Sequence, residues 1–207
     1  MLKSFQDLTN KIVNLVNSPS SIQKTTRKAV ASRVVLKTYC EDVHLTDQHG
    51  FFAGSLGEYS MRLDGGKFII NPSNFPIARL TDEDILVAAI QREMVVSDTL
   101  PARHIEWHRM IYKKTSAKMV IICQPNAICI LANQMRKPPK GILNDTDEVL
   151  DSVVCTEPSE KQLSDYLIKY QTILIKGIGV LSWGKTFEEL FDRIALITSL
   201  SEIYLQK

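Results

Sequence analysis

The chain has 207 residues, of which 44% are hydrophobic and 23% are charged, and its formal net charge is +2. A disordered chain would carry fewer apolar residues and a larger net charge, so this composition predicts a folded globular protein. The small net charge gives no support for nucleic-acid binding, and no apolar run approaches the roughly 20 residues of a membrane-spanning helix.

The first part of the chain has the apolar spacing of helices. Residues 2–17 carry one apolar stripe, which predicts an extra N-terminal helix within residues 1–20, ahead of a main domain at residues 21–207. A second helical pattern runs from about Ile22 to Tyr39. The polar residues 41–50 are then expected to form a loop.

The pattern next changes to strands. Two alternating segments, Tyr59–Leu63 and Lys67–Asn71, flank Asp64-Gly65-Gly66, which predicts a tight hairpin. Further strands are predicted at Ile85–Ile90, Glu93–Val96, Lys118–Cys123, Thr172–Lys176 and Gly179–Trp183. Helices are predicted at Arg103–Lys114, Ala127–Gln134 and Glu160–Tyr170, and from the Thr186 cap to Leu205. Residues 136–160 are irregular, with short edge strands.

Helices and strands therefore mix without a strict β-α-β alternation. This order predicts an α/β protein with one partly antiparallel sheet and helices on both faces, which is a three-layer αβα arrangement. The four cysteines, Cys40, Cys123, Cys129 and Cys155, form no CxxC pair. Together with the absence of a signal-peptide pattern, they lead us to expect a reduced, cytoplasmic protein.

Four segments, taken in order, resemble the class II aldolase/adducin family. They are Ser55–Asn74, Leu80–Val87, Leu100–Ile122 and Ile173–Gln206, and the most specific stretch is GVLSWGKTFEELFDR in the last of them. The resemblance covers roughly Ile22–Gln206. It implies a central, mainly antiparallel sheet between helical layers and a homotetramer. It also implies enzymes that cleave or rearrange sugar phosphates with a divalent cation, usually zinc.

The chain departs from the family at each residue that the resemblance assigns to the metal. The family's HxH strand end reads Ile122-Cys123-Gln124, the histidine of its NHG turn falls on Ile178, and its glutamate falls on His104. No histidine follows His108, so a shifted alignment does not restore the ligands. We therefore expect no zinc and no other cofactor.

The resemblance also assigns three turns to phosphate binding, and a phosphorylated small molecule is the ligand that it implies. Here these turns read Gly57-Glu58, Ser73-Asn74 and Ala102-Arg103. Gly57, Ser73 and Asn74 remain candidates for binding a phosphate, as do Arg103 and Gln124. Glu58 would repel a phosphate unless it were paired, and it is a candidate for a polar cluster with Arg62 and Arg103.

Two candidates for chemistry remain. His104 and His108 lie four residues apart on one helix, a spacing that can hold a metal, although no third strong ligand accompanies them. Cys123, at the end of its strand, would need a nearby base to act as a nucleophile, and His104 is the candidate base. His44 and His49 lie in the expected polar loop, where exposed histidines are common.

Two functions are compatible with these patterns. The first is a class II aldolase/adducin fold without metal chemistry, used as a binding or assembly module, as adducin's own head domain is. The alternative is an aldehyde-lyase or related sugar-phosphate enzyme with a site rebuilt around His104, Cys123, Gln124 and Arg103. We favour the first, because isoleucine cannot ligate a metal and would surround a retained cation with hydrocarbon.

Overall fold

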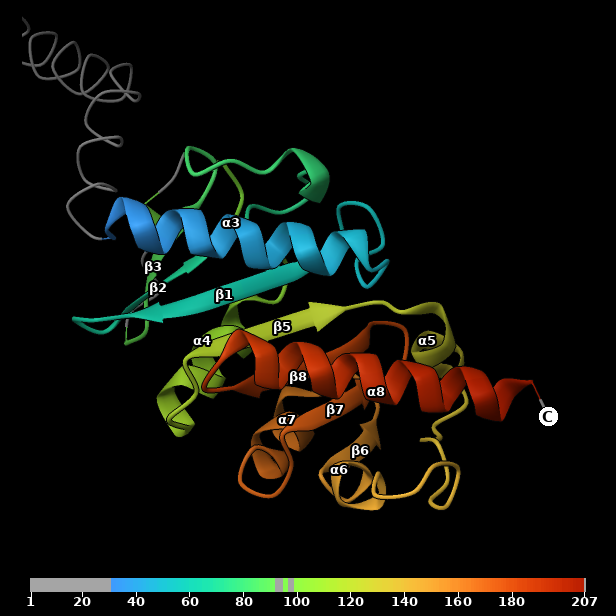
Figure 1. Ribbon diagram of the computed structural model, residues 1–207. Coiled ribbons are helices and arrows are strands. Elements are labelled where there is room, and N and C mark those ends of the chain that lie inside the picture. Colours follow the sequence, from blue (N-terminus) through green and yellow to red (C-terminus); the bar gives the residue numbers. More distant parts are fainter. Residues whose placement is uncertain (1–30, 92–94, 97–98, 207) are drawn as a thin grey trace, which may run out of the picture.

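The computed structural model describes residues 31–91, 95–96 and 99–206. Within these residues, one eight-stranded sheet lies between two layers of helices (Figure 1). The strands are β1 (Glu58–Leu63), β2 (Lys67–Ile70), β3 (Leu86–Ala89), β4 (Val95–Val96), β5 (Met119–Cys123), β6 (Val153–Thr156), β7 (Thr172–Ile175) and β8 (Gly179–Gly184). The helices are α3 (Arg33–Gln48), η1 (Ile77–Arg79), α4 (Ile105–Lys114), α5 (Asn126–Asn133), α6 (Asp147–Asp151), α7 (Glu160–Tyr166) and α8 (Phe187–Leu205).

The sheet has the strand order β4-β3-β2-β1-β5-β8-β7-β6. Every neighbouring pair is antiparallel except β6 and β7, which are parallel. The predicted α/β class with a mainly antiparallel central sheet is therefore confirmed. The extra helix predicted at residues 2–17 lies outside the described residues.

Both faces of the sheet are buried, because successive residues of a strand point to opposite faces. Ile69 belongs to one core cluster and its neighbour Ile70 to the other, and both are fully buried. The first core lies under α3, α5 and α8, and includes Tyr39, Val43, Ile69, Ile128 and Ile194. The second core lies under α4 and α7, and includes Ile70, Trp107, Ile111, Leu163 and Trp183. Figure 1 shows α3 and α8 both on the near face, with β1 and β5 visible between them.

Two local predictions are confirmed. β1 and β2 form the expected hairpin around Asp64-Gly65-Gly66, and both glycines have positive φ angles, of 70° each. The N-terminus of α8 is capped by Thr186, whose hydroxyl accepts the backbone N–H of Glu189 at 3.2 Å. Such a cap stabilises a helix by roughly 1 kcal/mol.

The prediction of a polar loop at residues 41–50 is wrong. The helix α3 continues to Gln48, because Asp42, Val43 and Thr46 are buried on one side of it while exposed residues of this stretch occupy the other. The irregular segment 136–160 also contains the short helix α6 and the strand β6, which is the predicted edge strand. Among the described residues, no helix is both long and apolar enough to cross a membrane.

Candidate functional site

The strand ends that carry the candidate residues meet at one edge of the sheet, which we call the site edge. β1 begins there with Glu58, which lies opposite Ile122 near the end of β5. The second residue of β8 lies opposite Cys123. The loop at residues 51–57 and the turn at residues 71–74 border the same edge, because β1 and β2 are antiparallel neighbours.

A row of polar side chains runs inward from the site edge between β1 and α4. Alternate residues of a strand share a face and advance about 6.6 Å, while every fourth residue of a helix shares a face and advances about 6 Å. Because the two spacings nearly match, polar residues can meet repeatedly along this interface. We call the row the polar seam, and its members are Glu58, Ser60, Arg62, His104, His108 and Tyr112.

The outer end of the polar seam is a buried carboxylate between two imidazoles. Nδ1 of His104 lies 2.7 Å from Oε1 of Glu58, and the backbone N–H of His104 donates to the two carboxylate oxygens at 3.3 and 3.2 Å. Nε2 of His108 lies 3.4 Å from Oε2 of Glu58, an ion-pair distance without good hydrogen-bond alignment. The side chain of Glu58 is only 4% exposed, so these contacts replace the water that would otherwise solvate its charge.

Two opposing effects determine the pKa of the Glu58 carboxyl. Burial alone would raise the pKa of the Glu58 carboxyl, because the charged form loses solvation. The hydrogen bond with His104 and the nearby His108 imidazole outweigh burial and lower the pKa of Glu58 to about 2. At neutral pH, Glu58 is therefore a fixed negative charge rather than a proton donor.

The inner part of the polar seam around Ser60, His108 and Tyr112 is closed to solvent. The hydroxyl of Ser60 lies 2.6 Å from Nδ1 of His108 and 2.8 Å from the hydroxyl of Tyr112. Arg62 donates to the carbonyl of Tyr112, and its guanidinium lies over that ring, 4.9 Å from the ring centre. The Glu58-His108-Ser60 order resembles that of a hydrolase triad, but Ser60 and His108 have no exposed surface. No substrate can reach this serine, so the inner seam is structural.

The turns assigned to phosphate binding, which we call the closed cradle, enclose almost no space. The cavity that Gly57, Ser73 and Arg103 line with Glu58 has a volume of about 10 Å³. A single water molecule already needs roughly 10–15 Å³ on this measure. Nη2 of Arg103 donates to Oδ1 of Asn74 at 2.7 Å, so two of the predicted phosphate contacts bind each other.

Gly57 has a packing reason to be glycine. A Cβ atom at this position would lie 2.1 Å from Cδ1 of Phe52, which is far inside contact distance. The carbonyl of Gly57 accepts the side-chain amide of Asn71 at 2.9 Å. The close approach of the Phe52 ring therefore accounts for this residue without a ligand.

The positions that the resemblance assigns to metal-ligating histidines do not offer a donor set for zinc. Ile122 is fully buried in the second core, and Ile178 packs against that core. Oε1 of Gln124 accepts the backbone N–H of Ala53 at 3.4 Å, and its amide nitrogen donates to the carbonyl of Leu56 at 3.4 Å. A protein zinc site requires several nitrogen, sulfur or oxygen donors, which hydrocarbon side chains lack, so the residues present do not fit the ion.

Beside these positions lies a second cavity at the site edge. It has a volume of about 260 Å³ and is lined by Gln124, Asn126, Asn133 and Ile178 among others. Oδ1 of Asn133 accepts the backbone N–H of Gly177 at 2.8 Å, which holds the turn before β8 against α5. The described residues that border the cavity therefore carry amides, apolar groups and the thiol of Cys129, without a carboxylate or an imidazole.

The structure does not bring Cys123 and His104 together. Cys123 is fully buried in the first core, whereas the ring of His104 packs against Trp107, 4.5 Å between centres, on the second-core face. Burial, and then the neighbouring Cys129, raise the pKa of the Cys123 thiol well above its ordinary value. The predicted nucleophile–base pairing is wrong, because alternation along β5 turns the thiol away from α4.

The remaining histidines do not converge on a metal centre. His44 lies on α3, and Nδ1 of His49 lies 2.9 Å from the carbonyl of Leu45 at the end of the same helix. In the part of the chain that the structure describes, no group of three or more His, Cys, Asp or Glu side chains is placed to hold a metal ion.

The family described as the class II aldolase and adducin N-terminal domain matches residues 37–205. The chain belongs to the class II aldolase and adducin family. No curated protein matches the chain in sequence. This family assignment confirms the resemblance, and the polar seam, the closed cradle and the site edge all lie within the matched residues.

Solved structures support the same fold. An L-fuculose 1-phosphate aldolase superposes with a TM-score of 0.73 at 15% identity, covering 86% of this chain and 87% of that chain. The Escherichia coli protein YgbL, described as a putative aldolase/epimerase/decarboxylase, gives 0.72 at 16% identity, covering 84% and 89%. An L-fuculose-1-phosphate aldolase from Thermus thermophilus gives 0.69 at 21% identity, covering 84% and 94%. At these identities, the likeness establishes the fold.

Sequence reasoning missed the inner half of the polar seam. It named Glu58 and His104 but proposed partners for Glu58 at Arg62 and Arg103, and those arginines instead bind Tyr112 and Asn74. The sequence does contain a signal for the polar seam: polar residues occur at every second position of β1, and the two histidines of α4 lie four residues apart. Neither period alone says which strand and helix pack together.

Proposed function

We propose that this class II aldolase/adducin family member does not perform metal-dependent cleavage of sugar phosphates and acts as a non-catalytic binding or assembly module. The observation that carries the proposal is the position of the Glu58 carboxylate. It accepts the backbone N–H of His104 and contacts two imidazoles, which are the groups at the site edge best suited to an anion.

An internal carboxylate is therefore held where a phosphate would need positive potential. A bound phosphate would have to displace a buried, already satisfied negative charge or lie beside it, and both are unfavourable. The closed cradle beside Ser73 and the hydrocarbon at Ile122 and Ile178 point the same way. The alternative enzyme would need Cys123 and His104 on one face of the sheet, which the alternation of β5 opposes.

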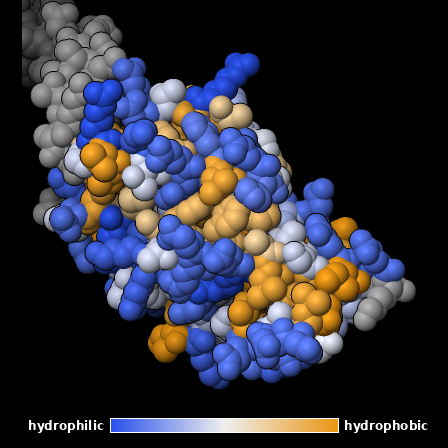
Figure 2. All heavy atoms as spheres, viewed as in Figure 1, coloured by the Kyte–Doolittle hydropathy of each residue, from blue (hydrophilic) through white to orange (hydrophobic). Residues whose placement is uncertain are grey.

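The proposal includes assembly into a homo-oligomer, with a tetramer expected from the family, in the cytoplasm. Its four cysteines are free thiols, which suits a reducing compartment. Large apolar side chains remain exposed, such as Val34 at 75% and Leu100 at 75%. Figure 2 shows apolar side chains among the hydrophilic ones on the face that α3 and α8 cover. A subunit interface would bury such groups.

The test compares the purified protein with an L-fuculose 1-phosphate aldolase treated identically. After incubation with zinc and removal of the free ion, elemental analysis should find far less than one zinc per chain in this protein. It should also fail to cleave a panel of phosphorylated ketoses, L-fuculose 1-phosphate among them. Stoichiometric zinc that is lost in His104→Ala, or turnover that tracks added zinc, would refute the proposal.

A gain-of-binding variant sharpens the test. Glu58→Ala removes the internal anion, so inorganic phosphate should then shift the backbone amide resonance of His104, whereas in the wild type it should not. The matched control is Asp192→Ala, which removes an exposed carboxylate from α8 and leaves Glu58 in place. If wild-type protein binds phosphate at His104 as well as the variant does, Glu58 does not occupy the anion position.

A further inference from the structure

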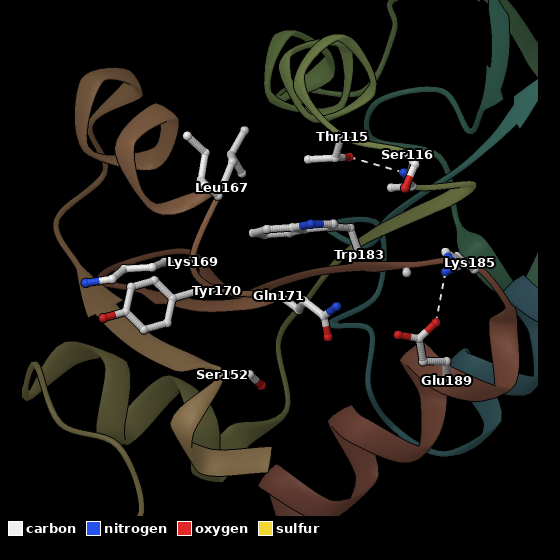
Figure 3. A pocket seen from close by; sticks show the side chains of 13 residues that line it. Thr115, Ser116, Ser152, Leu167, Lys169, Tyr170, Gln171, Trp183, Lys185 and Glu189 are labelled. Atoms are coloured by element: carbon white, nitrogen blue, oxygen red, sulfur yellow. Dashed lines mark hydrogen bonds between the residues drawn. The ribbon is translucent and has the colours of Figure 1, made fainter. Parts of the chain in front are cut away.

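A larger cavity lies at the opposite edge of the sheet, where β5 begins and β8 ends. We call it the far-edge pocket. It has a volume of about 460 Å³, within the roughly 300–1,000 Å³ of small-molecule sites. Figure 3 shows Trp183 across its middle, with Thr115 and Ser116 on one side and Lys169, Tyr170 and Gln171 on the other. None of these residues belongs to the site edge.

Trp183 forms the floor of this pocket. Its side chain is only 4% exposed, so it offers an apolar edge rather than a full stacking face.

The carboxylate of Glu189 and the amide oxygen of Gln171, which both line the far-edge pocket, already accept hydrogen bonds. One oxygen of Glu189 accepts Nη2 of Arg193 at 2.7 Å, and the other accepts the backbone N–H of Lys185 at 2.9 Å. Nη2 of Arg193 also donates to Oε1 of Gln171 at 2.9 Å. Since this bond takes the amide oxygen, the amide nitrogen of Gln171 is the group left to bind a ligand.

The donors, in contrast, are free. Figure 3 shows the side chain of Lys169 directed away from Trp183, on the opposite side of the pocket from Lys185. The ammonium group of Lys185 has no carboxylate within 4 Å among the described residues, since the salt bridges there involve other cations. Lysine and the amide nitrogen only donate hydrogen bonds. With Glu189 neutralised by Arg193, the pocket carries an excess of positive charge and of donors. Its apolar wall includes the buried Leu167.

We propose that the far-edge pocket binds a small organic anion, whose carboxylate or phosphate group contacts Lys185 and the amide nitrogen of Gln171 while its apolar part packs on Trp183 and Leu167. The anion supplies an acceptor for these two donors, and the apolar part covers the hydrocarbon at the floor of the pocket. The proposal does not depend on the site edge, so it stands whether or not metal chemistry occurs there.

The test adds three small-molecule probes of one shape to the full-length protein. Binding of each probe is followed through the amide and indole resonances in NMR spectra. The probes are 1-naphthoate, 1-naphthyl phosphate and the neutral 1-naphthalenemethanol. At least one anionic probe should shift the Trp183 indole resonance, which Trp183→Phe identifies, with a dissociation constant below the millimolar range. The neutral probe should bind roughly tenfold more weakly, a difference of about 1.4 kcal/mol. Comparing the affinities of 1-naphthoate and 1-naphthyl phosphate shows whether the pocket prefers a carboxylate or a phosphate.

A charge-removal variant separates this site from non-specific binding. Lys185→Gln should weaken the anionic probes roughly tenfold and leave the neutral probe unchanged. Lys161→Gln is the matched control, because it removes one exposed lysine outside the pocket. Exposed lysines contribute little to folding, so both variants should remain folded by circular dichroism. No shift of the Trp183 indole, equal affinity for the neutral probe, or equal weakening in the control would each overturn the proposal.

Discussion

At the residue scale, Gly179 is the clearest case of a side chain excluded by its surroundings. It has a φ of +122°, and a Cβ atom there would lie 2.3 Å from the carbonyl oxygen of Cys123. The other glycine of the turn, Gly177, also has a positive φ, +73°, but open space around it. Comparing substitutions at these two glycines therefore distinguishes the cost of steric overlap from the cost of backbone strain.

We expect Gly179→Ala to destabilise the protein by about 3 kcal/mol, because the clash is with backbone that cannot move without breaking the β5–β8 ladder. Gly177→Ala should lose only about 1 kcal/mol, the strain of a left-handed alanine. Denaturant unfolding of both variants measures the difference. Equal losses would show that β8 can shift away from Cys123.

The second residue-scale prediction concerns Glu58 and acid. Its pKa in the folded protein, about 2, lies below the ordinary 4.5, so ionised Glu58 stabilises the fold above pH 4.5. That contribution is lost as the pH falls from about 4.5 towards 2. At 1.36 kcal/mol for each unit of pKa, it amounts to about 3 kcal/mol.

The stability difference between wild type and Glu58→Gln should therefore shrink by about 3 kcal/mol between pH 5 and pH 2. Denaturant titrations at a series of pH values measure this, and the difference between the two proteins cancels the titration of other carboxyls. Parallel stability curves for the two proteins over this range would mean that Glu58 is not held as its contacts indicate.

At the scale of elements, the polar seam joins β1 to α4 in place of hydrophobic contacts. A double-mutant cycle with Glu58→Gln and His104→Gln should give a coupling energy of about 1–3 kcal/mol, because each substitution leaves the other partner poorly paired. The matched cycle combines Glu58→Gln with His49→Ala, at the end of α3, whose ring packs on Phe191 at 4.8 Å between centres. The control pair should be additive within about 0.5 kcal/mol, and similar coupling in both cycles would contradict a specific seam.

The same elements show which structural features can be predicted from the sequence and which depend on the rest of the fold. The β1–β2 hairpin and the α8 cap depend on neighbours within a few residues, so turn and cap chemistry sufficed to predict them. The extension of α3 to Gln48 depends on the burial of Val43 and Thr46 against the rest of the fold, and local polarity was misleading there. The partners of Glu58 depend on which helix lies over β1, which the sequence does not specify locally.

At the scale of the whole molecule, one sheet serves two cores. Adjacent residues of each central strand belong to different cores, so neither core can separate from the sheet without exposing strand backbone that the other core also needs. Both tryptophans, Trp107 and Trp183, lie in the second core. Their fluorescence therefore reports on that core alone, whereas far-ultraviolet circular dichroism reports on all helices and strands.

This arrangement predicts a single cooperative transition that responds equally to damage on either face. Ile69→Ala removes buried hydrocarbon from the first core and Ile70→Ala from the second, and both residues are fully buried on β2. Each substitution should cost about 2–5 kcal/mol. Ile69→Ala, although remote from both tryptophans, should shift the fluorescence transition as much as the circular dichroism transition. If Ile69→Ala left the fluorescence transition in place while circular dichroism shifted, the two cores would unfold separately, and the shared sheet would not couple them.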